Sequence, residues 1–366
     1  MGKPKIRFKG YTDEWEQRKL DDVVEFLDTM RKPLEGAKRI PGPYPYYGAS
    51  GIVDYVDGYL FDEELILLSE DGANITDRNY PVCFLASGKY WVNNHAHVLR
   101  TKQENENNFI CNSLERKDYT QYNTGMAMPK LNKETCKKIP ISCPRFEEQK
   151  KIGDYFRSLD HFITLHQRKY EKTQKLKKYM LQKMFPQNGR KVPEIRFSGF
   201  TEEWEQRKFS DVVDIGSGMD YKHLEEGDIP VYGTGGYMLS VNKALSDDKD
   251  AVGIGRKGTI DKPYILKAPF WTVDTLFYCI PKENYDLDFT SCIFQNVDWK
   301  KKDESTGVPS LSKVIINNVE TATPTFDEQK KIGNYFRSFD RLITLHQQKC
   351  DELRNVKKFM LQNMFI

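Results

Sequence analysis

Two glycine-rich segments in the second half of the chain have the residue types of a cofactor-binding turn. Val212–Gly218 places two glycines after a short apolar run, as in the strand that holds S-adenosylmethionine in methyltransferases, and Gly253–Gly258 has the glycine spacing of a dinucleotide-binding turn. Neither segment is followed by a helical pattern, and the chain has no Asn/Asp-Pro-Pro-aromatic tetrapeptide of the kind that grips a target amine. We therefore expect no catalysis by this chain, and we interpret Gly253–Gly258 as a strand that leads into a tight basic turn.

Polar residues in both halves have the chemistry of DNA recognition. Arg and Lys donate hydrogen bonds to guanine edges and phosphates, and Asn and Gln pair with adenine. Such residues follow predicted strands and turns, whereas Trp91 and Trp271, which recur at one position, are expected to lie in the core. The candidate DNA-binding residues are Tyr47, Ser50, Arg78, Asn79, Asn93, Asn94, His95 and Lys130 in the first half, and Thr234, Tyr237, Arg256, Lys257, Thr259, Lys262, Asp274, Thr275, Ser310 and Lys313 in the second.

Cysteine, histidine and apolar runs argue against three other classes of protein. The seven cysteines are odd in number and include no Cys-x-x-Cys pair, so we expect reduced, buried thiols. His95 and His97 could face one way on a strand, but no Cys or carboxylate stands at ligand spacing beside them, which predicts no metal site. No run of about 18 apolar residues occurs, so we expect a cytoplasmic protein without membrane contact.

The chain contains two copies of one pattern. Ile6-Arg7-Phe8 and the later Trp-Glu-Gln-Arg-Lys recur 189 residues on, beginning at Ile195 and Trp204. The segment Phe-Glu-Glu-Gln-Lys-Lys-Ile-Gly at 146–153 recurs 180 residues on as Phe-Asp-Glu-Gln-Lys-Lys-Ile-Gly at 326–333. Between these landmarks the copies have diverged, so each repeat is a near-identical frame around a different insert. Two inserts that recognise different targets on one frame would diverge in this way.

The frame after each insert has the periodicity of a long helix. From Phe146 to Phe185 and again from Phe326 onward, apolar residues alternate at spacings of three and four, which is the pattern of a coiled-coil seam. Thr325 and Glu328 have the spacing of a capping box, and Pro186 ends the first helix. A helix of about 40 residues is roughly 60 Å long and cannot bury its stripe alone. We therefore expect the two helices to pair antiparallel and to hold two DNA readers about one to two helical turns of DNA apart.

The duplicated Glu-Gln-Lys-Lys-Ile-Gly helix start, Asp160 or Asp340 after it, and the Met-Leu-Gln-x-Met-Phe helix end resemble the specificity subunits of type I restriction-modification systems. The resemblance covers the whole chain. It implies that each insert is a target-recognition domain reading one half of a bipartite sequence in double-stranded DNA. It also implies that the helices dock two methyltransferase subunits, that restriction subunits join the complex, and that S-adenosylmethionine, ATP and Mg²⁺ belong to those partners. We assign partner binding to Lys150, Lys151, Arg157, Lys330, Lys331 and Arg337.

The resulting expectation is an α/β (α+β) protein in which two globular recognition domains are joined by two long antiparallel coiled-coil helices in a pseudo-two-fold repeat. The predicted boundaries are 1–144 for the first domain, 145–185 for its helix, 186–208 for the linker and the start of the second repeat, 209–324 for the second domain and 325–366 for its helix. The alternatives are a duplicated, non-enzymatic scaffold whose inserts bind proteins and a self-sufficient enzyme. Both inserts carry more Asp and Glu than Lys and Arg, 18 against 14 and 18 against 12, so we expect weak DNA binding by this chain alone.

Overall fold

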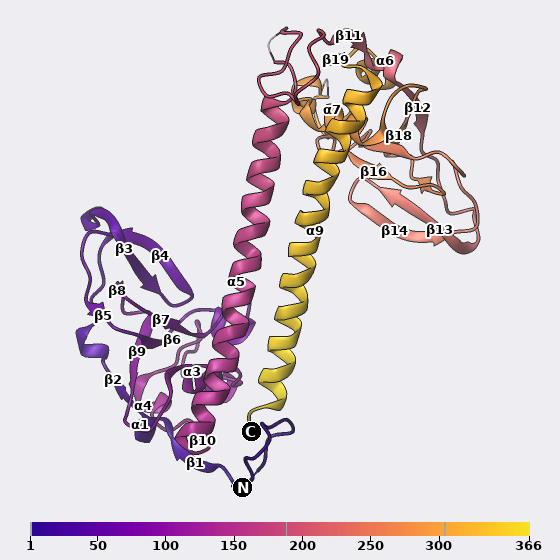
Figure 1. Ribbon diagram of the computed structural model, residues 1–366. Helices are drawn as coiled ribbons and strands as arrows, with labels where there is room; N and C mark the ends of the chain where they lie inside the picture. Colours follow the sequence, from indigo (N-terminus) through magenta and orange to yellow (C-terminus); the bar gives the residue numbers. More distant parts are fainter. Residues whose placement is uncertain (1, 188, 304) are drawn as a thin grey trace. The chain divides into compact units, whose positions relative to one another are not determined.

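The computed structural model describes residues 2–187, 189–303 and 305–366. These residues form two compact units, each of which combines one globular domain with parts of both long helices (Figure 1). Unit 1 contains the residues up to His166 together with Gln348–Ile366, and unit 2 contains Gln167–Gln347.

Unit 1 contains two four-stranded sheets and a strand pair. The first sheet is antiparallel with the order β2-β9-β6-β7, and the second has the order β4-β3-β8-β5, in which β3 and β8 run parallel. The pair β1-β10 joins the start of the domain to the segment before the long helix. The elements are β1 (Glu16–Lys19), α1 (Leu20–Val23), β2 (Val24–Phe26), η1 (Asp28–Met30), η2 (Gly36–Lys38), β3 (Pro41–Gly48), β4 (Gly51–Val56), β5 (Phe61–Asp62), β6 (Leu65–Ser69), α2 (Asn74–Asp77), β7 (Cys83–Ala86), β8 (Lys89–Val92), β9 (Ala96–Thr101), α3 (Asn107–Glu115), η3 (Thr120–Tyr122), α4 (Lys133–Cys136), β10 (Pro140–Cys143) and the start of α5 (Phe146–Lys183).

Unit 2 repeats this plan with small changes. Its sheets have the orders β12-β18-β15-β16 and β14-β13-β17, and β11 pairs with β19 as β1 pairs with β10. The elements are β11 (Glu205–Lys208), α6 (Phe209–Val212), β12 (Val213–Ser217), β13 (Glu226–Gly233), β14 (Gly236–Val241), β15 (Ala251–Gly255), β16 (Tyr264–Leu266), β17 (Trp271–Thr272), β18 (Leu276–Pro281), α7 (Leu287–Asn296), η4 (Trp299–Lys302), α8 (Lys313–Asn317), β19 (Glu320–Thr323) and the start of α9 (Phe326–Asn363).

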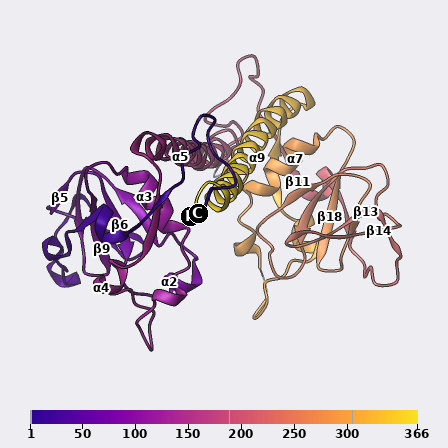
Figure 2. The ribbon, with the colours of Figure 1, turned by 90° about the horizontal axis from the view of Figure 1, so that it is seen from below.

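The central strands and the short helices follow from their residue types. Strand β6 reads Leu-Ile-Leu-Leu-Ser and is fully buried, as expected for a strand covered on both faces. Glu106 caps α3 by accepting a 2.6 Å hydrogen bond from the Phe109 amide, and Asp286 caps α7 in the same way at 2.9 Å. Figure 2 shows α3 next to α5 and the strands of unit 1, where the Asn108 side chain donates to the Gly153 carbonyl at 2.7 Å.

The ends of the long helices complete the two cores. Met184 and Phe185 follow α5 and are buried in unit 2, where Phe185 stacks on Phe289 with ring centroids 5.6 Å apart. Phe365 follows α9 and stacks on Phe109 in unit 1 at 5.3 Å. Each domain is therefore closed by the end of the helix from the other repeat.

The expected mixed class and the antiparallel pairing of the helices are confirmed within each unit. Unit 1 holds the start of α5 against the end of α9, and Lys357 pairs with Asp160 across the seam at 2.6 Å. Unit 2 holds the other two ends, and there Lys177 pairs with Asp340 at 2.6 Å. These residues are equivalent at an offset of 180, so one polar contact recurs in both units.

Candidate nucleic-acid interface

Four chain segments of unit 1 meet at one edge of the domain, which we call the loop edge. The turn after β3 reaches Ser69, whose hydroxyl donates to the Ala49 carbonyl at 2.5 Å. The Glu70 amide donates to the His95 carbonyl at 2.9 Å, and the Gly72 amide donates to the Pro129 carbonyl at 3.0 Å. The loop edge of unit 1 comprises Gly48–Gly51, Ser69–Gly72, Asn93–His95 and Thr124–Leu131.

Unit 2 has the same edge with the same backbone hydrogen bonds. The Arg256 amide donates to the Thr275 carbonyl at 2.8 Å, and the Gly258 amide donates to the Pro309 carbonyl at 2.8 Å. Gly72 and Gly258 have φ values of 116° and 92°, which only glycine adopts without strain, so the turn is kept in both units. This loop edge comprises Gly233–Gly236, Gly255–Gly258, Val273–Thr275 and Ser305–Leu311.

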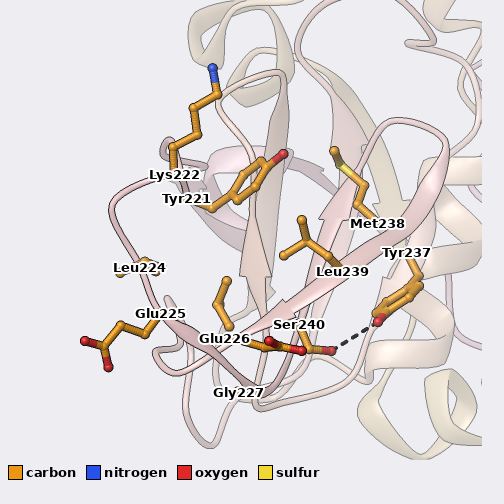
Figure 3. A pocket seen from close by; sticks show the side chains of 11 residues that line it. Tyr221, Lys222, Leu224, Glu225, Glu226, Gly227, Tyr237, Met238, Leu239 and Ser240 are labelled. Atoms are coloured by element: carbon orange, nitrogen blue, oxygen red, sulfur yellow. Dashed lines mark hydrogen bonds between the residues drawn. The ribbon is translucent and has the colours of Figure 1, made fainter.

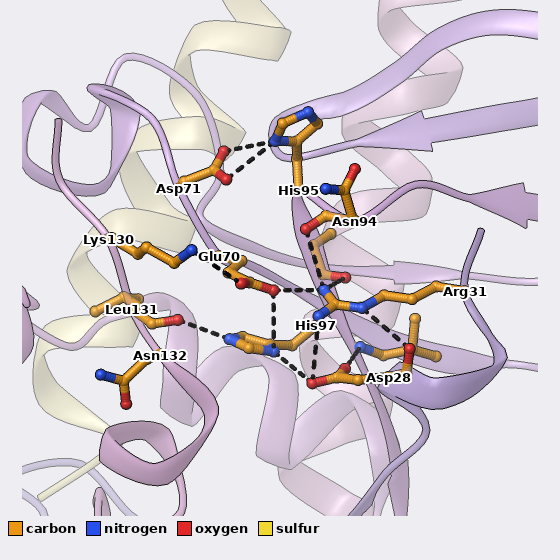
Figure 4. A network of polar contacts seen from close by, with 12 residues as sticks. Asp28, Arg31, Glu70, Asp71, Asn94, His95, His97, Lys130, Leu131 and Asn132 are labelled. Carbon is orange, nitrogen blue, oxygen red and sulfur yellow. Dashed lines mark hydrogen bonds and ion pairs between the residues drawn. The ribbon is translucent and has the colours of Figure 1, made fainter. Parts of the chain in front are cut away.

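The side chains behind the loop edge of unit 1 form a charged network (Figure 4). The Arg31 guanidinium lies 2.6 Å from Glu70 and 3.6 Å from Asp28, and it donates to the Ala96 carbonyl at 2.7 Å. At the front of the edge, His95 Nδ1 lies 2.8 Å from the carboxylate of Asp71. Glu70 of the turn is thus paired with a cation of its own domain, and Asp71 lies within hydrogen-bond distance of His95.

His97 is the buried cation of this network. Its Nδ1 lies 2.8 Å from Asp28 Oδ2 and its Nε2 lies 2.7 Å from the Leu131 carbonyl. Both partners accept, so both ring nitrogens must donate, which requires the imidazolium form. Burial lowers the pKa of His97, but the hydrogen bond and charge of Asp28, together with the neighbouring Cys136, raise it more, and the pKa is raised to about 10. The charged ring ties strand β9 to the loop that contains Leu131.

Unit 2 replaces this network by a cation over an aromatic ring. Phe277 pairs with Ile254 as His97 pairs with Leu68, so the two side chains occupy equivalent positions. The Arg256 guanidinium lies 6.0 Å from the centre of the Phe277 ring and donates to the Asp274 carbonyl at 3.3 Å. The same backbone turn therefore presents acidic residues in unit 1 and basic residues in unit 2.

Known proteins share the whole architecture. The family model described as type I restriction modification DNA specificity domain matches residues 12–175 and again residues 201–355. The chain belongs to the type I restriction-modification DNA specificity family. It is 22% identical to a type I restriction enzyme specificity subunit of Methanocaldococcus jannaschii over 94% of this chain and 91% of that protein. A putative type I restriction enzyme specificity subunit of Haemophilus influenzae is 36% identical over 39% of this chain and 36% of its own length. The crystal structure of the type I restriction-modification S subunit from M. genitalium has the same fold, with a TM-score of 0.80, 16% identity and coverage of 100% of this chain and 99% of that one.

In the first specificity domain, the loop edge brings together most of the predicted DNA-binding residues. Ser50, Asn94, His95 and Lys130 are exposed there. Tyr47 and Asn93 lie at the same edge but face inward, because the Tyr47 ring packs against Phe84 and Tyr90 and the Asn93 side chain accepts from the His95 amide at 2.8 Å. Arg78 and Asn79 are exposed after α2, where the Arg78 guanidinium pairs with Glu115 at 3.2 Å.

In the second specificity domain, Arg256, Lys257, Asp274, Thr275, Thr234 and Ser310 lie on the loop edge, and the first three are exposed. Thr259 is half-buried behind the turn, and Lys262 is exposed beyond it. Lys313 points inward and donates to the Ile215 carbonyl at 2.9 Å. Trp271 is buried as expected, whereas Trp91 is only half-buried and donates to the Lys32 carbonyl at 2.6 Å.

Tyr237 lines an open hollow of about 680 Å³ beside β14 (Figure 3). Its hydroxyl lies 3.2 Å from the Ser240 hydroxyl, and Tyr221, Met238 and Leu239 contribute to the same wall. In the first specificity domain, Arg39 lies over the Tyr46 ring at 4.7 Å and pairs with Asp54 on β4. The two domains thus differ on this hairpin as well as on the loop edge.

Three consecutive lysines that precede the second loop edge were not among the DNA-binding residues predicted from the sequence. Lys300, Lys301 and Lys302 are exposed and directly precede the loop that contains Ser310. Lys300 pairs with Asp261 at 2.8 Å, beyond the Arg256–Gly258 turn. The run Trp-Lys-Lys-Lys was visible in the sequence, but only the fold brings Lys300 to Asp261, three residues after Gly258.

Four of the six predicted partner-binding residues contact their own domain. The Lys151 ammonium lies 5.7 Å from the ring centre of Phe8, and Arg157 pairs with Glu64 at 2.8 Å. The equivalent Lys331 and Arg337 contact Phe197 and Asp288, at 5.5 and 3.2 Å. Lys150 and Lys330 are exposed, and Lys330 lies over the Phe326 ring at 4.2 Å. These contacts therefore attach the starts of α5 and α9 to their own domains, a role that the sequence did not indicate.

Other residues of the duplicated Glu-Gln-Lys-Lys-Ile-Gly helix start also attach each helix to its domain. The buried carboxylates of Glu148 and Glu328 accept two hydrogen bonds each from Arg7 and Arg196, at 2.7 to 2.8 Å. The predicted capping role of Glu328 is thus replaced by an ion pair, because Arg196 reaches its carboxylate from a segment 132 residues away. Gly153 brings α5 against Glu106, where an added Cβ would lie 2.0 Å from the carboxylate.

Over 2–187, 189–303 and 305–366, no group of three His, Cys, Asp or Glu side chains is arranged to hold a metal ion. No helix in that part of the chain has the length and apolar character to cross a bilayer.

Proposed function

We propose that this chain recognises a bipartite DNA sequence with two different specificity domains and catalyses no reaction itself. The observation that carries the proposal is the shared loop edge with unlike side chains. One backbone turn carries Glu70 and Asp71, which pair with residues of their own domain, in the first domain and the exposed Arg256 and Lys257 in the second. Exposed Arg and Lys donate to guanine, whereas the paired acidic turn offers no such donors, so the two edges favour different bases.

The long helices set the distance between the two half-sites in this proposal. Each has 38 residues, which corresponds to roughly 57 Å at about 1.5 Å per residue. The reciprocal pairs Lys357–Asp160 and Lys177–Asp340 fix the register of the seam. A fixed register supports a constant gap between the half-sites in DNA.

Two methyltransferase subunits dock on the helices, and restriction subunits join that complex. S-adenosylmethionine, ATP and Mg²⁺ belong to these partners. Support comes from exposed apolar residues at equivalent positions of the two helices. Unit 1 exposes Phe162 of α5 with Val356 and Phe359 of α9, and unit 2 exposes the equivalent residues Leu342, Leu176 and Tyr179. A surface that occurs once in each unit fits a partner that binds twice.

Docking can be tested by placing negatively charged side chains on one of these apolar surfaces. Phe162→Glu with Phe359→Glu should leave one methyltransferase subunit bound where the unchanged chain binds two, since a few buried aromatic residues supply most interface energy. Native mass spectrometry of the co-expressed proteins gives the stoichiometry directly, and Lys169→Ala, an exposed site on the same helix, is the control. Retention of two subunits by the charged variant would refute this docking surface.

Recognition is tested by sequencing N6-methyladenine in cells that express this chain with its methyltransferase subunit. The expected result is a bipartite motif with a constant gap. Arg256→Ala with Lys257→Ala should relax one half only, by about tenfold to a hundredfold in preference, because a good base contact contributes about 1–3 kcal/mol of discrimination. Lys243→Ala with Lys249→Ala removes the same charge elsewhere in that domain and should leave the motif unchanged.

Two results would contradict the proposal. A motif that keeps both halves in the Arg256 and Lys257 variant would remove the role of the second loop edge. Capture of a protein other than the methyltransferase and restriction subunits by the inserts, with no methylated motif, would support a protein-binding scaffold instead. Tight specific binding of DNA by the isolated chain at physiological salt would contradict only the expected weak binding, which rests on the acidic balance of both inserts.

A further inference from the structure

Each specificity domain projects a loop whose base is closed by one acidic or amide side chain. Asn123 Oδ1 accepts from the amides of Gly125 and Lys130, at 2.9 and 2.8 Å. Asp303 Oδ1 accepts from the amides of Ser305 and Ser310, both at 3.0 Å. The two clamps are equivalent at an offset of 180, so the repeat has kept this loop although its sequence has changed.

The base of the loop is also fixed to the loop edge. The Leu131 amide donates to the Glu70 carbonyl at 2.7 Å, and the Leu311 amide donates to the Arg256 carbonyl at 2.9 Å. In the first domain the buried His97 holds the Leu131 carbonyl as well. An added Cβ at Gly125 would lie 1.8 Å from the Met128 carbonyl, so the backbone there is tightly folded. The base of each loop is therefore held to the loop edge by backbone hydrogen bonds.

The tip of each loop carries exposed apolar side chains. Met126 and Met128 are 104% and 60% exposed, and Val308, equivalent to Met128, is 56% exposed. Scattered exposed hydrophobic residues are common, but here they recur at one loop position of both repeats. Lysines lie close to the tips in the sequence. Lys130, whose side chain is 49% exposed and lies 3.5 Å from Glu70, follows Met128 by two residues, and Lys300–Lys302 precede the second loop.

We propose that these tips are wedges that insert between neighbouring base pairs of the DNA half-sites. Apolar residues such as Met, Leu and Ile unstack base steps in this way in DNA-bending proteins. The adjacent lysines fit the phosphates on either side of an opened step. The inference rests on the proposed function, because it places DNA at the loop edge. The two methionines make the first domain the stronger wedge, whereas the second domain combines a smaller tip with more positive charge.

The test uses the complex of this chain with its methyltransferase subunits and duplexes that carry 2-aminopurine at successive positions of the target. Unstacking raises 2-aminopurine fluorescence. We expect a rise at one step of one half-site, separate from the rise at the methylated adenine. Met126→Ser with Met128→Ser should abolish that rise and weaken DNA binding by about tenfold to a hundredfold, because the apolar contacts of the tip with the opened base step are lost. Ile40→Ser, at an exposed apolar residue of the same unit just before the start of β3, at the opposite end of that strand from the loop edge, is the control.

The outcomes separate the wedge from the proposed function. Unchanged fluorescence and affinity in the double variant, with methylation of the bipartite site intact, would overturn the wedge alone. Loss of the methyltransferase subunit from the variant would assign the tip to a protein contact and overturn the wedge as well. A complex of unchanged chains that methylates no bipartite site would overturn the proposed function and the wedge together. Both methionines are exposed, so the variant should keep its melting temperature.

Discussion

Removal of the Arg196 side chain should destabilise unit 2 by about 3–5 kcal/mol, because it leaves the carboxylate of Glu328 buried without its cation. The Glu328 side chain is 1% exposed and the Arg196 side chain 12%. Two parallel hydrogen bonds of 2.7 and 2.8 Å join the groups. Arg196→Ala deletes both bonds to a carboxylate that is 1% exposed, so the loss exceeds that of a surface ion pair, which is about 0–1 kcal/mol.

The size of the loss should depend on what replaces the pair. Arg196→Lys keeps the charge but cannot form the two-pronged contact, so an intermediate loss is expected. Arg196→Leu with Glu328→Leu should cost less than Arg196→Ala alone, because no buried charge is left behind. Arg7→Ala is the equivalent change in unit 1, where Glu148 is 2% exposed, and a loss of the same size is expected there.

Amide hydrogen exchange measures the effect unit by unit. The Ile195 amide, which donates to the Lys183 carbonyl at 2.9 Å, and the Trp204 amide, which donates to the Lys191 carbonyl at 2.8 Å, report on the segment that Arg196 anchors. Their exchange should accelerate by at least a hundredfold in Arg196→Ala, since about 1.4 kcal/mol corresponds to a factor of ten. Amides of the unit 1 core are the internal control. A loss below about 1 kcal/mol, or equal acceleration in both units, would refute the buried-ion-pair account.

Three further changes give distinct results. The pKa of His97 is raised to about 10 from an ordinary 6.5, so the charged ring stabilises unit 1 fully below pH 6.5, and this stabilisation is lost as the pH rises through 10. The free energy of urea unfolding should therefore decline over this range, and His97→Phe should make the decline smaller. Gly333→Ala places a Cβ 2.3 Å from Asp286 Oδ1 and should lower the melting temperature by several degrees in calorimetry, whereas Gly307→Ala, in open space, should not. Phe365→Ala creates a cavity in the core of unit 1 and should lower the free energy of urea unfolding by about 3–5 kcal/mol. An unchanged unfolding midpoint would exclude a core role for Phe365.

The sequence by itself determined the features that depend on local pattern. Alternation of apolar residues at three and four predicted α5 and α9 almost to their ends, because a helix with a buried stripe needs that period. The sequence also predicted a strand that leads into a tight basic turn at Gly253–Gly258, and there β15 ends at Gly255 and Gly258 has a left-handed backbone. The resemblance of the duplicated helix start placed the chain in its family, which the match of residues 12–175 and 201–355 confirms.

Only the tertiary structure decided what the shared residues contact. Glu328 fits a helix cap by spacing, yet it binds Arg196 from 132 residues away, and Lys151 and Arg157 contact their own domain although they look like a free basic face. The acidic turn at Glu70 is balanced by Arg31 and by the buried His97. Periodicity and spacing indicate contacts between residues that are close in the sequence. The contacts named above instead depend on which distant segments lie together after folding. For the same reason, the exposed tips at Met126 and Val308 became visible only once the fold had buried the residues around them.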